Sequence, residues 1–215
     1  NIQWLFPSIG VQIPHKAWFA QKILREIISN WYQCSRLLPE QEFHWNLLLS
    51  LPFSCGKIRQ IVVAPDGSYL LLAGADGYYR KIDTTYFNET QQTFAHQEGC
   101  TALCILPSGD ILSAGKDAYI RRWSASGEKL NAFPAHLGTI YQLLALSDGN
   151  YVSASRDKSI KIWDQNNDQI QQKLDLQMAG HRHSINALIA FENGFASAGD
   201  DKRILLWHAQ NPKTP

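Results

Sequence analysis

One pattern of four residue types, repeated three times, constrains the fold of this chain more than any other feature. Each copy places a His, a Ser, an Asp and a Trp in that order: His96, Ser113, Asp117 and Trp123; His136, Ser153, Asp157 and Trp163; and His181, Ser197, Asp201 and Trp207. The Asp precedes the Trp by six residues and the Ser precedes it by ten in every copy, while His and Ser are 17, 17 and 16 apart. Such fixed offsets predict a repeated structural unit.

A fourth, eroded copy comes before these three. Asp76 takes the place of the Asp, Cys55 falls on the His position, Leu72 replaces the Ser, and Ile82-Asp83 stands where the Trp is expected. Successive Asp residues of the four copies are 41, 40 and 44 positions apart. This period is close to the length of a propeller blade made of four strands.

Short apolar runs separated by turns divide each repeat into strands. First strands buried on both faces are expected at 58–63, 102–106, 140–145 and 185–190. Second strands are expected at 69–73, 111–114, 151–154 and 195–198, after hairpin turns in which Gly67, Gly109 and Gly149 supply a positive φ. Third strands are expected at 119–123 and 159–163, and outer strands at 91–94, 129–133 and 170–176.

These residues resemble the WD-repeat β-propeller family, over about residues 47–208. Trp163-Asp164 carries the dipeptide that names the family, and Gly180-His181 carries its Gly-His pair. The resemblance implies an all-β fold of four recognisable blades, at 47–94, 95–133, 134–176 and 177–208, with a tail at 209–215. Family members typically have more blades, so we expect a piece of a larger propeller or an incomplete arc. Completion by another chain and closure as an unusual small ring are the alternatives.

The resemblance also assigns a role to the repeated polar residues. In the family, the Asp, His, Ser and Trp of one blade form a buried hydrogen-bonded relay, which here implies a structural role for all twelve residues of the three intact copies. A catalytic triad is disfavoured, because a nucleophile must face a substrate and occurs once, whereas this set occurs three times. We therefore expect no catalytic residue and no enzyme activity in this chain.

Neither a metal nor another cofactor is expected. His181 belongs to the relay, which leaves His183 without the close second ligand that zinc sites usually have. The chain contains no Gly-rich phosphate-binding motif. Its four cysteines are expected to be reduced, buried thiols of a cytosolic protein. Cys100 and Cys104 are four residues apart in or beside a predicted strand, so we expect both to point to the same face.

Candidate partner-binding residues follow from the rim of the disc that WD-repeat proteins expose. The resemblance places Arg59, Thr101, Tyr141 and Asn186 on this rim near the first strands, and Lys116, Arg156 and Asp200 just before the relay aspartates. Exposed Arg and Tyr often anchor interfaces. Arg59, Lys116 and Arg156 together suggest an acidic or phosphorylated ligand segment, and Tyr141 would suit a carbohydrate or peptide ligand.

Residues 1–46 do not fit the repeat. Apolar residues at helical spacing predict one amphipathic helix at about 16–33, with Pro14 at its entry, and we expect it to pack within the protein. The run Leu47–Leu51 stands where an outer strand would stand, whereas only a polar, proline-rich tail follows the last repeat. An early strand is therefore expected to complete the last blade.

The charge balance and the repeats together predict the function. The net charge of +1, spread over mixed basic and acidic residues, argues against nucleic-acid or anionic-membrane binding. Neither a membrane span nor a signal peptide is recognisable, and we expect a cytoplasmic protein. The chain does not begin with Met, so we expect a piece of a longer protein.

We predict a non-catalytic protein–protein interaction scaffold or sensor module that binds other proteins or peptides of unknown identity. The alternative is a regulatory WD-repeat part of a larger signalling protein or enzyme whose catalytic domain lies outside this chain. An open arc of blades would also favour self-association, because its end strands would expose apolar faces.

Overall fold

The computed structural model describes residues 50–166, 168–175, 177, 180–192 and 194–208. The chain divides into two units, residues 1–51 and 52–215, and the fold described here is that of the second. The segment 1–46 with its predicted helix, the first residues of the predicted strand 47–51, and the tail 209–215 lie outside the described residues.

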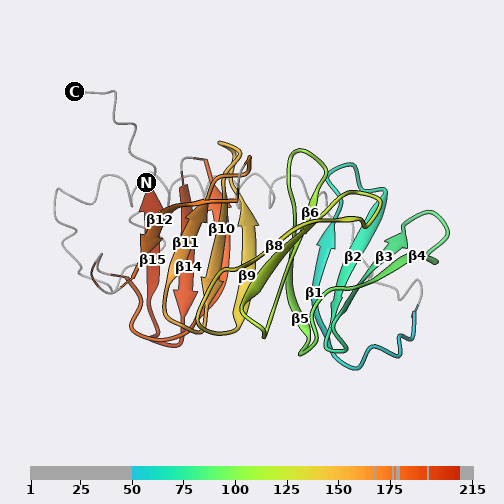
Figure 1. Cartoon of the computed structure of the whole chain (residues 1–215), viewed down its shortest axis with the longest axis horizontal. Helices are drawn as coiled ribbons and strands as arrows, with labels where there is room; N and C mark the ends of the chain where they lie inside the picture. Colours follow the sequence, from blue (N-terminus) through green and yellow to red (C-terminus); the bar gives the residue numbers. More distant parts are fainter. Residues whose placement is uncertain (1–49, 167, 176, 178–179, 193, 209–215) are drawn as a thin grey trace, which may run out of the picture. The chain divides into compact units, whose positions relative to one another are not determined.

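Four antiparallel sheets follow one another along the chain, and each is one blade (Figure 1). Strands that are neighbours in the sequence are neighbours in each sheet. Blade 1 contains β1 (Ile58–Val63), β2 (Tyr69–Gly74), β3 (Tyr78–Asp83) and β4 (Glu89–Phe94). Blade 2 contains β5 (Cys100–Ile105), β6 (Ile111–Gly115), β7 (Tyr119–Trp123) and β8 (Lys129–Pro134). Blade 3 contains β9 (Ile140–Ala145), β10 (Tyr151–Ser155), β11 (Ile160–Trp163) and β12 (Ile170–Leu174). Blade 4 contains β13 (Ile185–Phe191), β14 (Gly194–Gly199) and β15 (Ile204–His208).

The predicted all-β blades are therefore confirmed, with strand ends that differ by at most two residues from those expected. The hairpin turns contain the expected glycines, and Gly67, Gly109 and Gly149 all have positive φ values, of 73°, 87° and 88°. Gly adopts this left-handed conformation without the steric penalty that a Cβ would impose.

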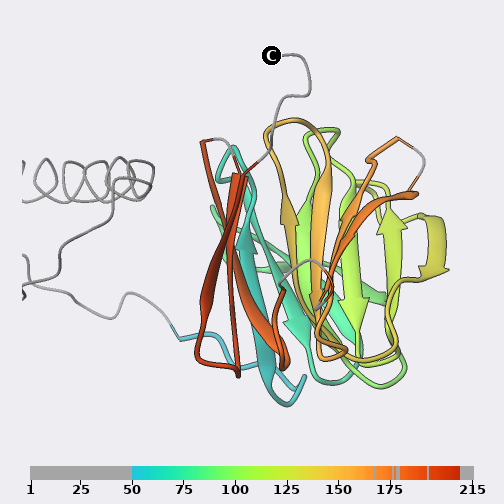
Figure 2. The ribbon, with the colours of Figure 1, turned by 90° about the vertical axis from the view of Figure 1, so that its left-hand side faces the viewer.

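Neighbouring blades pack face to face, and this packing forms the core. Between blades 2 and 3, Leu112 and Ile120 contact Leu143 and Trp163. The other two interfaces repeat this arrangement with Trp123 in blade 2 and Trp207 in blade 4. The middle strands β6 and β10 are buried along their whole length, because each has a blade on both sides. Figure 1 shows the blades in a row, and in Figure 2 blades 1 and 4 lie to one side of blades 2 and 3, so the row is curved.

The outward faces of the first and last blades are exposed. Ile61 and Val63 on β1 are 58% and 59% exposed, and Ile189 and Ile204 in blade 4 are 68% and 73% exposed. The equivalent of Ile61 in blade 2 is Leu103, which is buried beneath blade 1. The expectation that every first strand is buried on both faces is thus wrong for β1 and β13, because no further described blade covers them.

Blade 4 has three strands within the described part of the chain. The residues after His208 lie outside the described part, so the expectation that the last repeat does not supply its own outer strand stays a prediction. Ser50 and Leu51, the described end of the run expected to complete the blade, are not in a strand. Completion of blade 4 by the run 47–51 therefore stays a prediction.

The expectation that Cys100 and Cys104 share a face is wrong. Cys100 is buried between blades 1 and 2, whereas Cys104 is buried between blades 2 and 3. A β-bulge lies between Cys100 and Ala102, and the extra residue reverses the alternation of side chains. Cys55, Cys100 and Cys104 are all buried, unpaired thiols, as expected.

A glutamine joins blades 3 and 4 through their backbones. Gln142 donates from Nε2 to the Leu188 carbonyl over 3.1 Å and accepts from the Leu188 N–H over 3.0 Å. We expect Gln142→Leu, which keeps the size but removes both bonds, to lower the free energy of unfolding by about 1–3 kcal/mol. It should also speed hydrogen exchange at the Leu188 amide. Urea denaturation and exchange mass spectrometry measure these effects, with the exposed Gln92→Leu as control. Unchanged exchange at Leu188 would contradict the assignment.

Candidate functional site

The four repeated residues of blade 3 form one continuous chain of hydrogen bonds. Trp163 donates from its indole nitrogen to Ser153 Oγ over 2.8 Å, and Ser153 Oγ lies 2.6 Å from His136 Nε2. His136 Nδ1 lies 2.9 Å from Asp157 Oδ2. An indole N–H only donates and a carboxylate only accepts. Trp163 therefore donates to Ser153, Ser153 donates to His136, and His136 donates to Asp157.

Blades 2 and 4 contain the same chain. In blade 2, Ser113 Oγ lies 2.9 Å from both Trp123 Nε1 and His96 Nε2, and in blade 4 the corresponding distances at Ser197 are both 2.8 Å. The His rings are 2.9 Å from Asp117 and Asp201. In each blade, these hydrogen bonds connect the second strand (β6, β10 or β14) to the loop before the first strand and to the loop before the third strand.

Blade 1 holds its loop in a different way. Arg80 donates to Asp76 through two nitrogens, at 3.2 and 2.6 Å, and Arg121 at the equivalent position of blade 2 likewise pairs with Asp117. Cys55, which occupies the His position, is buried. The eroded repeat therefore keeps its Asp because Arg80 gives the carboxylate a charged partner.

The environment of the relay perturbs its titrating groups. Burial disfavours the charged Asp117 carboxylate, but hydrogen bonds from His96 and Arg121 outweigh it and lower the pKa of Asp117 to about 2. The pKa of Asp201 falls to about 2 against the same effect of burial, through the Arg182 N–H and His181. For Asp157 the lowering is larger. Burial lowers the pKa of His136, so this ring is neutral at pH 7.

The relay serines cannot act as nucleophiles in this arrangement. Ser113, Ser153 and Ser197 have at most 1% of their surface exposed, and each hydroxyl is engaged by both a Trp and a His. A nucleophile must reach a substrate atom. The His–Ser–Asp sets therefore hold loops and blades together.

The four first-strand candidate residues share one structural feature. Arg59, Thr101, Tyr141 and Asn186 are each the extra residue of a β-bulge, at the second position of β1, β5, β9 and β13. Bulges re-aim a side chain and are common beside functional sites. The Thr101 hydroxyl is used internally, however, because it lies within hydrogen-bond distance of the Ala114 and Ile140 carbonyls.

The other candidates lie in the loops between second and third strands. Lys116, Arg156 and Asp200 are all exposed. Asp200 accepts a hydrogen bond from Asn186, so these two form a pair within blade 4. Lys116 and Arg156 are brought together in one hollow, whereas Arg59 lies apart from it in blade 1.

This hollow, of about 460 Å³, lies between blades 2 and 3, and we call it the Leu137 hollow. Its lining consists of Glu98, Lys116, Leu137, Gly138, Thr139, Arg156 and Asp157. Leu137 is 96% exposed, although its N–H donates to Asp157 over 3.0 Å. Sequence reasoning missed Leu137. Its signal was an apolar residue directly after a relay His, where the other intact copies have Gln97 and Arg182.

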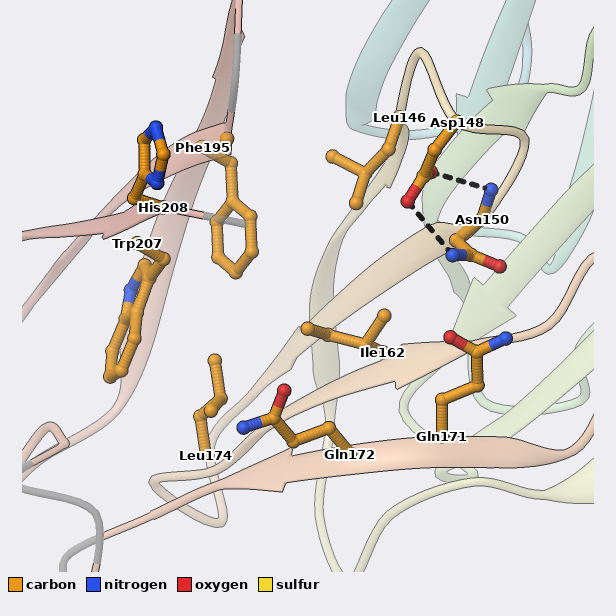
Figure 3. A pocket seen from close by; sticks show the side chains of 11 residues that line it. Leu146, Asp148, Asn150, Ile162, Gln171, Gln172, Leu174, Phe195, Trp207 and His208 are labelled. Atoms are coloured by element: carbon orange, nitrogen blue, oxygen red, sulfur yellow. Dashed lines mark hydrogen bonds between the residues drawn. The ribbon is translucent and has the colours of Figure 1, made fainter. Parts of the chain in front are cut away.

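A second hollow of about 460 Å³ lies between blades 3 and 4, at the opposite ends of the strands (Figure 3). Leu174 and Ile162 of blade 3 lie opposite Phe195 and Trp207 of blade 4. Its polar lining consists mostly of amide and carboxylate side chains, among them Asp148, Asn150, Gln171 and Gln172.

The corresponding place between blades 2 and 3 is filled by the chain itself. Arg122, the counterpart of Ile162, donates to Asp110 and to the Gln165 carbonyl. Tyr151, the counterpart of Phe195, donates to Asp168 in the turn after β11 over 2.9 Å. The counterpart of that turn in blade 4 follows His208 and lies outside the described residues. The second hollow therefore carries no functional assignment.

The described residues contain neither a cluster of metal-binding side chains nor a helix that could span a membrane. No three His, Cys, Asp or Glu side chains there lie together as a metal site. No helix in this part of the chain is long and apolar enough to cross a membrane.

Comparisons with known proteins agree with the blade structure. Residues 88–124 and 127–164 match the WD40 family, described as WD domain, G-beta repeat. Ribosome biogenesis protein YTM1 of Podospora anserina is 29% identical over 116 residues, which cover 49% of this chain and 24% of that protein. A ribosome biogenesis protein WDR12 homolog of Chlamydomonas reinhardtii is 28% identical over 111 residues, covering 47% of this chain and 25% of the relative.

Among solved structures, the computationally designed Ika4 protein resembles this chain with a TM-score of 0.65 and 24% identity. The match covers 78% of this chain and 100% of the designed one, and it supports the fold alone. The chain spans about a quarter of the length of the two ribosome biogenesis relatives. The chain thus contains WD repeats, as its residue pattern indicated.

Removing one relay hydroxyl tests the structural role of these sets. We expect Ser153→Ala to lower the free energy of unfolding by about 1–3 kcal/mol, because the buried Trp163 N–H and His136 Nε2 lose their partner. Urea denaturation measures the change. Ser147→Ala, at an exposed turn, is the control. Equal effects of the two substitutions would contradict a structural relay.

Stability should fall as the solution becomes acidic. Unfolded His136 binds a proton below its ordinary pKa of about 6.5, whereas folded His136 has a lowered pKa and stays neutral. Unfolded Asp117 and Asp201 are protonated below about pH 4, whereas in the folded chain they remain charged down to about 2.

In both ranges the unfolded chain binds more protons, so the free energy of unfolding decreases with falling pH. Urea denaturation at a series of pH values measures this decrease. His136→Gln should flatten the change between neutral pH and about pH 5 and keep the loss in the range of the carboxylates. A free energy of unfolding that rises on mild acidification would contradict this assignment.

Proposed function

We propose that this chain, whose WD repeats form blades of a β-propeller, is a non-catalytic interaction module that binds another protein through the loops at one rim of its blades. The main support is that the relay His, Ser and Asp residues, which resemble a catalytic triad, are hydrogen-bonded to one another inside the blades. Ser153 is fully buried and bonded to Trp163, so it has no free hydroxyl for a substrate.

The binding rim is formed by two sets of loops. Because each blade is an antiparallel meander, the loops between second and third strands lie at the same strand ends as the loops that lead into the next blade. Lys116 and Arg156 lie in the first set, and the bulged residues Tyr141 and Asn186 lie close to the second. The relay His and Asp residues anchor both sets of loops through hydrogen bonds, so the exposed side chains of these loops are held in fixed positions.

The names of the relatives support a role in assembling other molecules. Two of them are ribosome biogenesis proteins, and they match this chain over its WD repeats. WD repeats typically serve as interaction surfaces, and we extend that role to this chain. The cytoplasmic location, the partner's identity and the chain's oligomeric state stay predictions.

A pull-down with matched charge variants tests the proposal. The chain with Lys116→Glu and Arg156→Glu should lose partners that the unchanged chain recovers from a lysate. A chain with Asp148→Lys, at an exposed turn of the opposite rim, should retain them. Quantitative mass spectrometry of the bound proteins measures the difference. Equal recovery of every partner by both variants would contradict binding at this rim.

A further inference from the structure

The fold sorts the exposed charges of this chain onto opposite rims. The loops between second and third strands and the loops between blades carry exposed cations, and we call their surface the basic rim: Lys57, Lys116, Arg156, Lys158, Arg182 and Lys202. Exposed carboxylates on these loops are Asp76, which forms an ion pair with Arg80, Glu98, and Asp200, which is bonded to Asn186. The relay aspartates are mostly buried, and Asp117 is also paired with Arg121.

The opposite rim has the reverse charge. Its turns between first and second strands carry exposed Asp66, Asp148 and Glu192, and the turn between β7 and β8 carries Glu128. Lys129 is an exposed cation beside them. The net charge of +1 conceals this separation, because the two rims nearly cancel. Separated charges of this kind orient a charged partner toward one face.

The Leu137 hollow lies within the basic rim and adds an apolar contact to it. Lys116 and Arg156 line the hollow, and neither forms an ion pair within the described residues. Leu137 between them is almost fully exposed. An exposed Leu beside unpaired cations in a hollow is a surface that can take an apolar side chain and a carboxylate together.

The carboxylates of the hollow limit where an anion can sit. Asp157 is occupied by the Leu137 N–H, by His136 and by Ser159, and only 11% of its side chain is exposed. Glu98 is exposed and repels a second carboxylate on its side of the hollow. The carboxylates of an acidic ligand are therefore favoured beside the two cations that line the hollow, Lys116 and Arg156.

We propose that the Leu137 hollow binds an acidic segment of a partner protein, with an apolar side chain against Leu137 and carboxylates beside Lys116 and Arg156. This inference rests on the proposed function and names the chemistry of its partner. A protein segment fits better than RNA, because RNA has no aliphatic side chain for Leu137, and Glu98 and Asp200 repel a continuous phosphate backbone.

One glycine in the hollow permits a sharp test. Gly138 does not have a positive φ, and a Cβ there would meet Arg156 Cβ and Asp157 N at 3.5 Å, an ordinary contact. The equivalent positions after the other relay histidines are Glu98 and His183, so this loop accepts long side chains. Gly138→Glu should fill the hollow and bring a negative charge without unfolding the blade. Gly138→Gln is the control of equal size without charge.

The probe is a short fluorescein-labelled peptide with a central Leu flanked by Asp and Glu. Matched peptides carry a central Ser, or Asn and Gln flanks, or Lys flanks, and a labelled oligouridylate represents RNA. Fluorescence anisotropy with the full chain measures binding at low and high salt. We expect the acidic Leu peptide to bind most tightly and to weaken at high salt, because screening reduces the attraction.

The variants distinguish the contribution of charge to peptide binding from the contribution of the apolar contact. Gly138→Glu should weaken the acidic Leu peptide about tenfold or more, and Gly138→Gln should weaken it less. Leu137→Ser should remove the preference for a central Leu over a central Ser. Asp148→Lys on the opposite rim should leave affinity within about twofold of the unchanged chain. Urea denaturation of each variant verifies that the blades remain folded.

Several results would overturn the inference. These are equal binding of acidic and neutral peptides, tighter binding of the Lys-flanked peptide or of oligouridylate, and unchanged affinity in Gly138→Glu. If the pull-down recovers partners that depend on Lys116 and Arg156 but ignore Gly138→Glu, this inference fails and the proposed function stands. If no partner depends on the rim at all, the proposed function fails with it.

Discussion

The structure depends on a buried indole N–H that must find an acceptor. Trp163 lies in the interface between two blades, where an unpaired polar group would cost free energy. Ser153 accepts a hydrogen bond from this N–H and donates one to His136, which in turn donates to Asp157. The same requirement in three blades fixes three residue types around each Trp, which is why the pattern is so regular in the sequence.

The relay also distinguishes residues that hold the loops in place from residues that are exposed on them. Its Asp end lies beneath the rim loops and holds their backbone, as the Leu137 N–H bond to Asp157 shows. Neighbouring side chains such as Lys116, Leu137 and Arg156 make no contribution to the core and are free to differ between blades. Blade 1 illustrates the tolerance of the scaffold, since its Asp76 is paired with Arg80 although the repeat has no His.

Packing between blades is the second constraint. Leu103, Leu143 and Leu188 at equivalent positions are buried, because each packs against the blade that precedes its own. Their counterpart Ile61 is exposed because no described blade precedes it. The apolar outer faces of blades 1 and 4 thus result from an arrangement in which every blade needs a neighbour, and not from any local peculiarity of β1 or β15.

The sequence by itself determined the repeat and the strands, because a 2-residue strand period and fixed offsets are local properties, whereas the partners within each relay were expected from the resemblance to WD-repeat proteins. It did not determine side-chain directions at the bulges, where one extra residue sends Cys100 and Cys104 to opposite faces. Only the tertiary structure decided that Lys116, Leu137 and Arg156 share one hollow and that basic and acidic loops lie on opposite rims. Loops far apart in the sequence lie side by side at this hollow because neighbouring blades pack against each other. The sequence of a single repeat does not specify that packing.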